Sequence, residues 1–139
     1  MSKLENELLK KLTAIDKIPD INHGGCAYVA LAVYRWLLSK NKRPMLVYEH
    51  WNINDYLQNS RFLLNEEGVT PTSCEHAFVI WKGKKIDSHG IRKFKKNNHI
   101  HKIVTEHLVV ESLKNRRSWN PSFDCNQVQK IEQIMESKF

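Results

Sequence analysis

The chain has 139 residues, of which 41% are apolar and 27% charged, and its formal net charge is +7. This length fits a single domain, residues 1–139, that can bury a core of its own. No apolar run reaches the roughly 20 residues of a membrane-spanning helix, and the N-terminus lacks the apolar core of a signal peptide. The 3 cysteines have no framework spacing, which is typical of free thiols in a reducing compartment. We therefore expect a cytoplasmic protein that does not bind membranes.

Apolar periodicity predicts two helices in the N-terminal part of the chain. Leucine and isoleucine at spacings of three and four indicate an amphipathic helix over residues 2–15. A loop follows over residues 16–22. The second helix is expected from Cys26 to Ser39, and its small residues permit close packing against another element: Ala27, Ala30 and Ala32.

The middle of the chain favours strands and loops. Residues 45–49 form a short β-prone run that indicates a buried strand. Residues 51–64 fit a short helix that could cover a site as a flap, and residues 65–73 read as a loop. Residues 90–98 are polar and basic and are expected to form another loop, whereas residues 100–110 favour a strand.

The clearest local signal is a hairpin. Residues 76–81 and 84–88 are β-prone and flank the dipeptide Lys82-Gly83, which suits a two-residue turn. Further on, residues 115–122 are interpreted as a linker. Asp124, followed three residues later by Gln127, matches a capping box and predicts a last helix with an apolar stripe. The stripe consists of Val128, Ile131, Ile134 and Met135. The predicted class is α+β, with N-terminal helices packed on a small antiparallel sheet.

Cys26 is the first candidate for chemistry. It follows Gly24-Gly25 and opens the second predicted helix. A cysteine at a helix start lies at the positive end of the helix dipole, which favours thiolate over thiol. This placement is typical of a nucleophile, although a buried core thiol is the ordinary alternative for a single cysteine.

A thiol nucleophile needs a base and a partner that orients the base. His76 opens one strand of the predicted hairpin, and Asp87 lies on the other. If Lys82-Gly83 is a two-residue turn, Phe78 pairs with Asp87, and His76 and Asp87 become diagonal neighbours on one face. A three-residue turn would place Asp87 on the opposite face, so the arrangement depends on the register.

The segments Gly-Gly-Cys26, His76-Ala-Phe-Val and Ile86-Asp87 resemble the papain-like cysteine-enzyme superfamily, in the broad sense that includes transglutaminase-like and toxin-type papain folds. The resemblance covers residues 22–90. It implies a papain-like fold and a Cys26–His76–Asp87 catalytic triad that performs acyl transfer, as in thiol proteases. The expected enzyme is a hydrolase or acyltransferase that acts on a peptide, isopeptide or glutamine amide through a thioester on Cys26.

The oxyanion of such a reaction needs hydrogen-bond donors. The backbone N–H of Cys26 is the natural first donor at a helix terminus. Papain-like enzymes often use a side-chain amide just upstream of the nucleophile, which here implies Asn22, with His23 as the other candidate.

Other interpretations of the same residues remain open. His23, Cys26, Cys74 and His76 have the residue types of a zinc site, but Cys74-x-His76 is shorter than the usual structural spacing. We therefore expect no metal and no cofactor. His89, His99, His101 and His107 are expected at the surface, and Cys125 is expected to be structural. The competing function is a binding module in which the basic segment, residues 82–102, docks nucleic acid or an acidic protein.

Overall fold

The computed structural model describes residues 2–19, 21, 25–50, 62–65, 68–71, 76–114 and 125–137. The described helices are α1 (Lys3–Ile15), α2 (Cys26–Ser39), α4 (Glu106–Lys114) and α5 (Cys125–Glu136). The described strands are β1 (Met45–His50), β2 (Phe62–Asn65), β3 (Gly68–Pro71), β4 (His76–Trp81), β5 (Lys84–Asp87), β6 (Gly90–Lys93) and β7 (Ile100–Val104). The predicted α+β class is confirmed. None of the described helices has both the length and the apolar character needed to cross a membrane.

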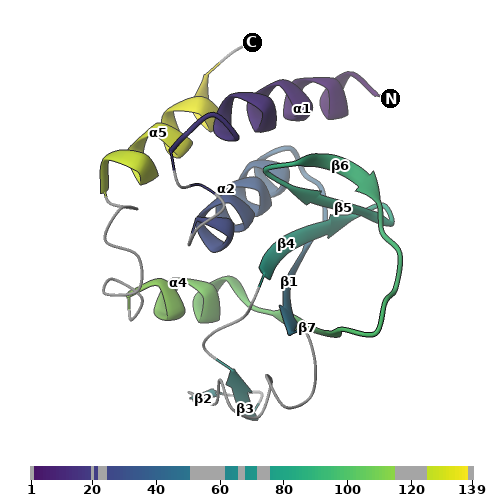
Figure 1. Ribbon diagram of the computed structural model, residues 1–139, viewed down its shortest axis with the longest axis vertical. Coiled ribbons are helices and arrows are strands. Elements are labelled where there is room, and N and C mark those ends of the chain that lie inside the picture. Colours follow the sequence, from purple (N-terminus) through teal and green to yellow (C-terminus); the bar gives the residue numbers. More distant parts are fainter. Residues whose placement is uncertain are drawn as a thin grey trace.

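Five strands form one antiparallel sheet in the order β6-β5-β4-β1-β7, and β2 pairs with β3 in a separate two-stranded sheet. Helix α2 packs on this larger sheet, chiefly against β4, and α5 packs on α2 (Figure 1). Helix α1 lies beside α5 and also contacts β6, while α4 contacts α2. The fold therefore places α2 between the sheet and α5.

Alternating residues of the strands build the core. The register pairs Leu46 with Val79, Val79 with Ile86, and Tyr48 with Ala77, and each of these side chains is at most 2% exposed. Because side chains of paired residues project to the same face, these positions form one apolar surface. Small and aliphatic residues of α2 share this core with the aromatic Trp36, among them Ala27, Ala30, Val33 and Leu37.

The predicted N-terminal helices, the first strand and the hairpin are confirmed. The expectations for residues 51–64 and 65–73 were wrong over the described part of these ranges, because Phe62–Asn65 and Gly68–Pro71 are paired strands. A short apolar run such as Phe62-Leu63-Leu64 fits either a helix or a strand by periodicity alone. Pairing with β3, a contact within the tertiary structure, decides for the strand. The rest of the proposed flap, residues 51–61, lies outside the described residues.

Two further expectations were wrong in the second half of the chain. Gly90–Lys93 forms β6 at the edge of the sheet, where a polar strand with a single apolar residue is tolerated. The run 100–110 is a strand only to Val104. The Thr105 hydroxyl then accepts a hydrogen bond from the Leu108 N–H at 3.1 Å and caps α4. The predicted linker, residues 115–122, lies outside the described residues.

Helix α5 confirms the last predicted helix. Its stripe residues Ile131 and Met135 are buried, at 1% and 7% exposed. Gln127 donates its side-chain amide to the Pro19 carbonyl at 2.5 Å and so ties the first turn of α5 to the segment after α1. Asp124, the proposed cap of this helix, lies outside the described residues.

Lys11 joins α1 to the C-terminal end of α5. Its side chain is 0% exposed. Its ammonium donates to the carbonyls of Ile134 and Met135 at 3.1 and 3.0 Å, and also to that of Ser137. The last carbonyls of a helix have no partner within the helix, and a cation at this end also interacts favourably with the helix dipole. Lys11 therefore supplies the C-terminal cap of α5 from another helix.

We expect Lys11→Met to lower the free energy of unfolding by about 2–3 kcal/mol, because it retains the apolar stem but removes the ammonium that donates to the carbonyls of Met135 and Ser137. Urea denaturation followed by circular dichroism measures the change. Lys10→Met is the matched control, since Lys10 is exposed on the same helix. Equal stability of the two variants would contradict the assignment.

Candidate active site

Cys26 is the first residue of α2, and Gly25 precedes it as the N-cap. The cysteine is partly buried and is not part of a disulfide. Ala27 and Ala30 are 0% and 2% exposed, and such small side chains allow the helix backbone to approach β4 closely. In Figure 1 this end of α2 lies close to the first residues of β4. The helix start therefore directs Cys26 toward the strand that begins with His76.

His76 lies beside Asp87, as the hairpin register predicts. Lys82 and Gly83 form the turn with φ of 52° and 70°, and Trp81 pairs with Lys84. Positive φ at both residues is the signature of a type I′ turn. The distance between His76 Nε2 and Asp87 Oδ2 is 3.1 Å. The predicted diagonal contact is thus present.

The structure also brings His76 to Cys26. The imidazole hydrogen-bonds to the Cys26 side chain as well as to Asp87. Because Nε2 faces the carboxylate, Nδ1 is the ring nitrogen left for the sulfur. The His76 side chain is 25% exposed, so part of the imidazole is in contact with solvent. The three residues that the sequence singled out form one contiguous chain, Cys26–His76–Asp87, and their catalytic roles remain a proposal.

Asp87 is a buried anion with several donors. The residue is 3% exposed. Besides His76, the backbone N–H of His89 donates to Oδ1 at 2.9 Å, and Arg92 Nη2 donates to Oδ2 at 2.8 Å. A buried carboxylate is tolerated only when it is paired and hydrogen-bonded. Arg92 was not predicted from the sequence. Its position two residues after Gly90, which pairs with Asp87, places it diagonally opposite Asp87 once the β5–β6 turn is recognised.

The pKa values of the pair move apart. Burial opposes the charged imidazole, but the hydrogen bonds to Asp87 and Cys26 and the charges of both partners outweigh it, raising the pKa of His76 to about 9. Burial also opposes the charged carboxylate. The hydrogen bond from His76, the charge of Arg92 and the His89 N–H nevertheless hold the pKa of Asp87 below its usual value. At neutral pH the site therefore contains an imidazolium and a carboxylate.

A second cluster of ionisable residues lies next to His76 on the sheet. Glu49 of β1 pairs across the sheet with His76 on one side and His101 on the other. Its carboxylate is 2.8 Å from His101 Nε2 and 3.5 Å from His99 Nδ1. Burial opposes the charged carboxylate, but the His101 hydrogen bond and nearby positive charges lower the pKa of Glu49. The expectation of an exposed surface residue was wrong for His101, whose side chain is only 15% exposed because it covers a buried acid 52 residues away in sequence. The His99 side chain is 37% exposed at the edge of this cluster.

The rest of the predicted site lies outside the described residues or does not assemble within them. Asn22, the oxyanion candidate, and His23 and Cys74, two of the possible zinc ligands, are among the undescribed residues, and the side chain of Cys125 is too. Over the described ranges, no group of three or more histidine, cysteine or acidic side chains could hold a metal ion. His89 is exposed and its backbone, not its ring, contacts Asp87.

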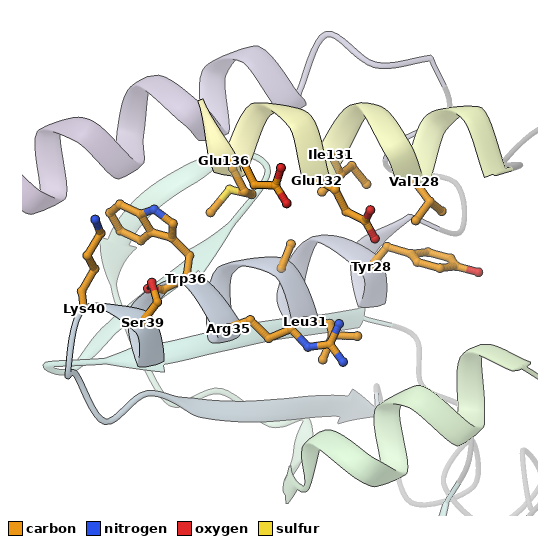
Figure 2. A pocket seen from close by; sticks show the side chains of 12 residues that line it. Tyr28, Leu31, Arg35, Trp36, Ser39, Lys40, Val128, Ile131, Glu132 and Glu136 are labelled. Carbon is orange, nitrogen blue, oxygen red and sulfur yellow. The ribbon is translucent and has the colours of Figure 1, made fainter. Parts of the chain in front are cut away.

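The cavity of about 630 Å³ between α2 and α5 is separate from this site (Figure 2). Apolar residues of both helices line it, among them Trp36 of α2 and Ile131 of α5, together with charged side chains such as Arg35 and Glu132. Cys26, His76 and Asp87 do not line it. We assign this cavity no role in the proposed chemistry.

Comparisons of the chain with protein-family models, curated proteins and solved structures found no match. The resemblance to papain-like enzymes therefore depends on the motifs and on the geometry described above.

We expect Asp87→Asn to lower the pKa of His76, because it removes both the charge and the anionic acceptor that favour the imidazolium. Nuclear magnetic resonance titration of the histidine ring protons measures it, with His76→Gln to assign the signal and Asp16→Asn as a control on an exposed carboxylate. An unchanged His76 pKa would contradict the contact.

The same shift has a consequence for stability. A raised folded-state pKa contributes stability that is complete below the unfolded value of 6.5 and is lost as pH rises toward about 9. The free energy of unfolding of the wild type should therefore fall across this interval, and it should fall less in Asp87→Asn.

Proposed function

We propose that this protein is a cysteine-dependent hydrolase or acyltransferase with a papain-like fold, acting on an amide. The observation that carries the proposal is the double contact of His76, which hydrogen-bonds to Cys26 and lies 3.1 Å from Asp87 through Nε2. A nucleophile, a base within reach of it and a third group that orients the base constitute the signature of covalent catalysis by a thiol.

The proposed reaction begins with Cys26 as thiolate and His76 as imidazolium. The sulfur attacks the carbonyl carbon of the amide, and the carbonyl oxygen takes the negative charge. The imidazolium then gives its proton to the leaving nitrogen, the C–N bond breaks, and a thioester remains on Cys26. Water or an amine attacks the thioester, His76 accepts its proton, and the thiolate is released with the acid or the new amide.

The surroundings of His76 suit both halves of this cycle. Before acylation, the thiolate charge is one cause of the raised pKa, so the imidazole carries the proton that the leaving group needs. Thioester formation removes this charge. The pKa of His76 then falls, and the ring becomes a base for the attacking water. The environment of one histidine therefore changes in the direction that each half-reaction requires.

The oxyanion has a first donor at the same helix end. The N–H groups of a first helical turn are directed out of the helix and favour negative charge. We propose the backbone N–H of Cys26 for the first contact. The two candidates for the second contact, Asn22 and His23, lie outside the described residues. Peptide, isopeptide and glutamine side-chain amides share this chemistry, and all three are substrate classes of the proposal.

We expect limiting iodoacetamide at pH 6 to label Cys26 at least about tenfold faster than Cys74 or Cys125, because an ordinary thiol with a pKa near 8.5 is almost wholly protonated there. Mass spectrometry of the tryptic peptides gives the ratio. His76→Ala should abolish the preference, whereas His107→Ala, at an exposed histidine, should leave it unchanged. Equal labelling of the three cysteines would refute the proposed nucleophile.

A binding function for the basic segment, residues 82–102, is the second candidate. Lys93, Lys95, Lys96 and Lys102 are exposed. Two other cations of the segment are already paired, Lys84 with Glu5 at 2.6 Å and Arg92 with Asp87 at 2.8 Å. The exposed lysines favour an anionic partner such as nucleic acid, since such contacts release counterions.

If this second candidate holds, affinity for a fluorescein-labelled oligonucleotide should fall steeply between about 50 and 200 mM salt. Fluorescence anisotropy measures it. Replacing both Lys95 and Lys96 by Gln should reduce the slope of log K against log salt by about 2, whereas the same change at Lys3 and Lys10 on α1 should not. Absence of binding at about 50 mM salt would exclude this function.

A further inference from the structure

Arg92 and His76 share one oxygen of Asp87. Arg92 Nη2 lies 2.8 Å from Oδ2, and His76 Nε2 lies 3.1 Å from the same atom. The other oxygen, Oδ1, accepts from the His89 N–H at 2.9 Å. The carboxylate that orients the proposed base is therefore also the anion of a second, permanently charged cation.

The sheet register fixes this arrangement. Asp87 pairs with Gly90 across the short β5–β6 turn, and Lys85 pairs with Arg92. Arg92 and Asp87 are thus diagonal neighbours on β6 and β5, just as His76 and Asp87 are on β4 and β5, and long side chains reach across a diagonal. Gly90 has φ of 125°, a conformation that L side chains rarely adopt, so glycine permits the turn.

Exposure differs between the partners. The Asp87 side chain is 4% exposed, whereas that of Arg92 is 52% exposed. The guanidinium therefore neutralises a buried charge from the edge of the sheet without itself being buried. Because about half of the Arg92 side chain is exposed to solvent, substitution of Arg92 is compatible with folding.

We propose that Arg92 is a positioning residue of the candidate site, which acts through Asp87 and weakens the hold of that carboxylate on the proton of His76. This inference rests on the proposed function, because it assigns Arg92 a part in the same reaction. If His76 were the only cation beside Asp87, the carboxylate would stabilise the protonated imidazole more strongly. With Arg92 on the same oxygen, less of the negative charge acts on the ring, and His76 can more readily accept a proton when the thioester is hydrolysed.

The test that does not depend on catalysis uses Cys26→Ala as background. Histidine ring protons are titrated by nuclear magnetic resonance in this variant and in combination with Arg92→Gln, Arg92→Lys or Lys93→Gln. We expect the pKa of His76 to rise with Arg92→Gln, to rise less with Arg92→Lys, which keeps the charge, and to stay unchanged with Lys93→Gln on the same strand. An unchanged or lowered pKa in the folded Arg92→Gln variant would overturn the proposal. Should that variant not fold, the Lys variant decides: a lowered pKa refutes the proposal.

The second test uses p-nitrophenyl acetate as an acyl donor on the chain with Cys26 intact. We expect Arg92→Gln to retain the burst of p-nitrophenol that reports acylation and to slow steady-state release by about two- to tenfold, because His76 then gives up its proton less readily. An equal or faster steady state would count against the role of Arg92. If no burst appears even in the wild type and iodoacetamide does not prefer Cys26, the proposed function fails. The titration still tests the link between Arg92 and His76.

Discussion

The two-residue turn between β4 and β5 is the constraint on which the candidate site depends. Positive φ at Lys82 and Gly83 fixes the pairing of Trp81 with Lys84, and every later pair of the hairpin follows from it. A slip of one residue would turn Asp87 to the other face of β5, toward the helices, where Ile86 now packs. The contact between Asp87 and His76 therefore follows from the backbone geometry of a turn that begins six residues after His76 and ends four residues before Asp87.

The packing of α2 supplies the other half of the site. Cys26 approaches β4 because alanines lie at the contact, and the strand presents Ala77 there in return. Larger side chains at these positions would move the helix outward and separate the sulfur from the imidazole. Tight packing of the small residues brings the polar groups from Cys26 to Arg92 close together. The hydrogen bonds among these groups then compensate for the cost of burying their charges.

Elements that local signals define were predictable from the sequence. Both N-terminal helices have clear periodicity, and the Lys-Gly dipeptide indicates the turn of the hairpin, so the sequence alone predicts the contact of His76 with Asp87. Contacts between distant segments could not. The sequence of β6 is too polar to predict a strand. It forms one because it pairs with β5 at the edge of the sheet. Glu49 meets His101 because β1 lies between β4 and β7, an order that no short motif encodes. Thr105 is a residue type that commonly caps helices, and its position within residues 100–110 could have indicated the start of α4.

The ammonium of Lys11 and the carbonyls it binds are 123 to 126 residues apart along the chain. During synthesis, α1 leaves the ribosome long before these carbonyls exist. The helix can form early, since its own hydrogen bonds are local, but its lysine must stay in water until α5 has emerged. The seam between α1 and α5 can therefore close only late in folding, after the residues of the β4–β5 hairpin and of α2 have been made.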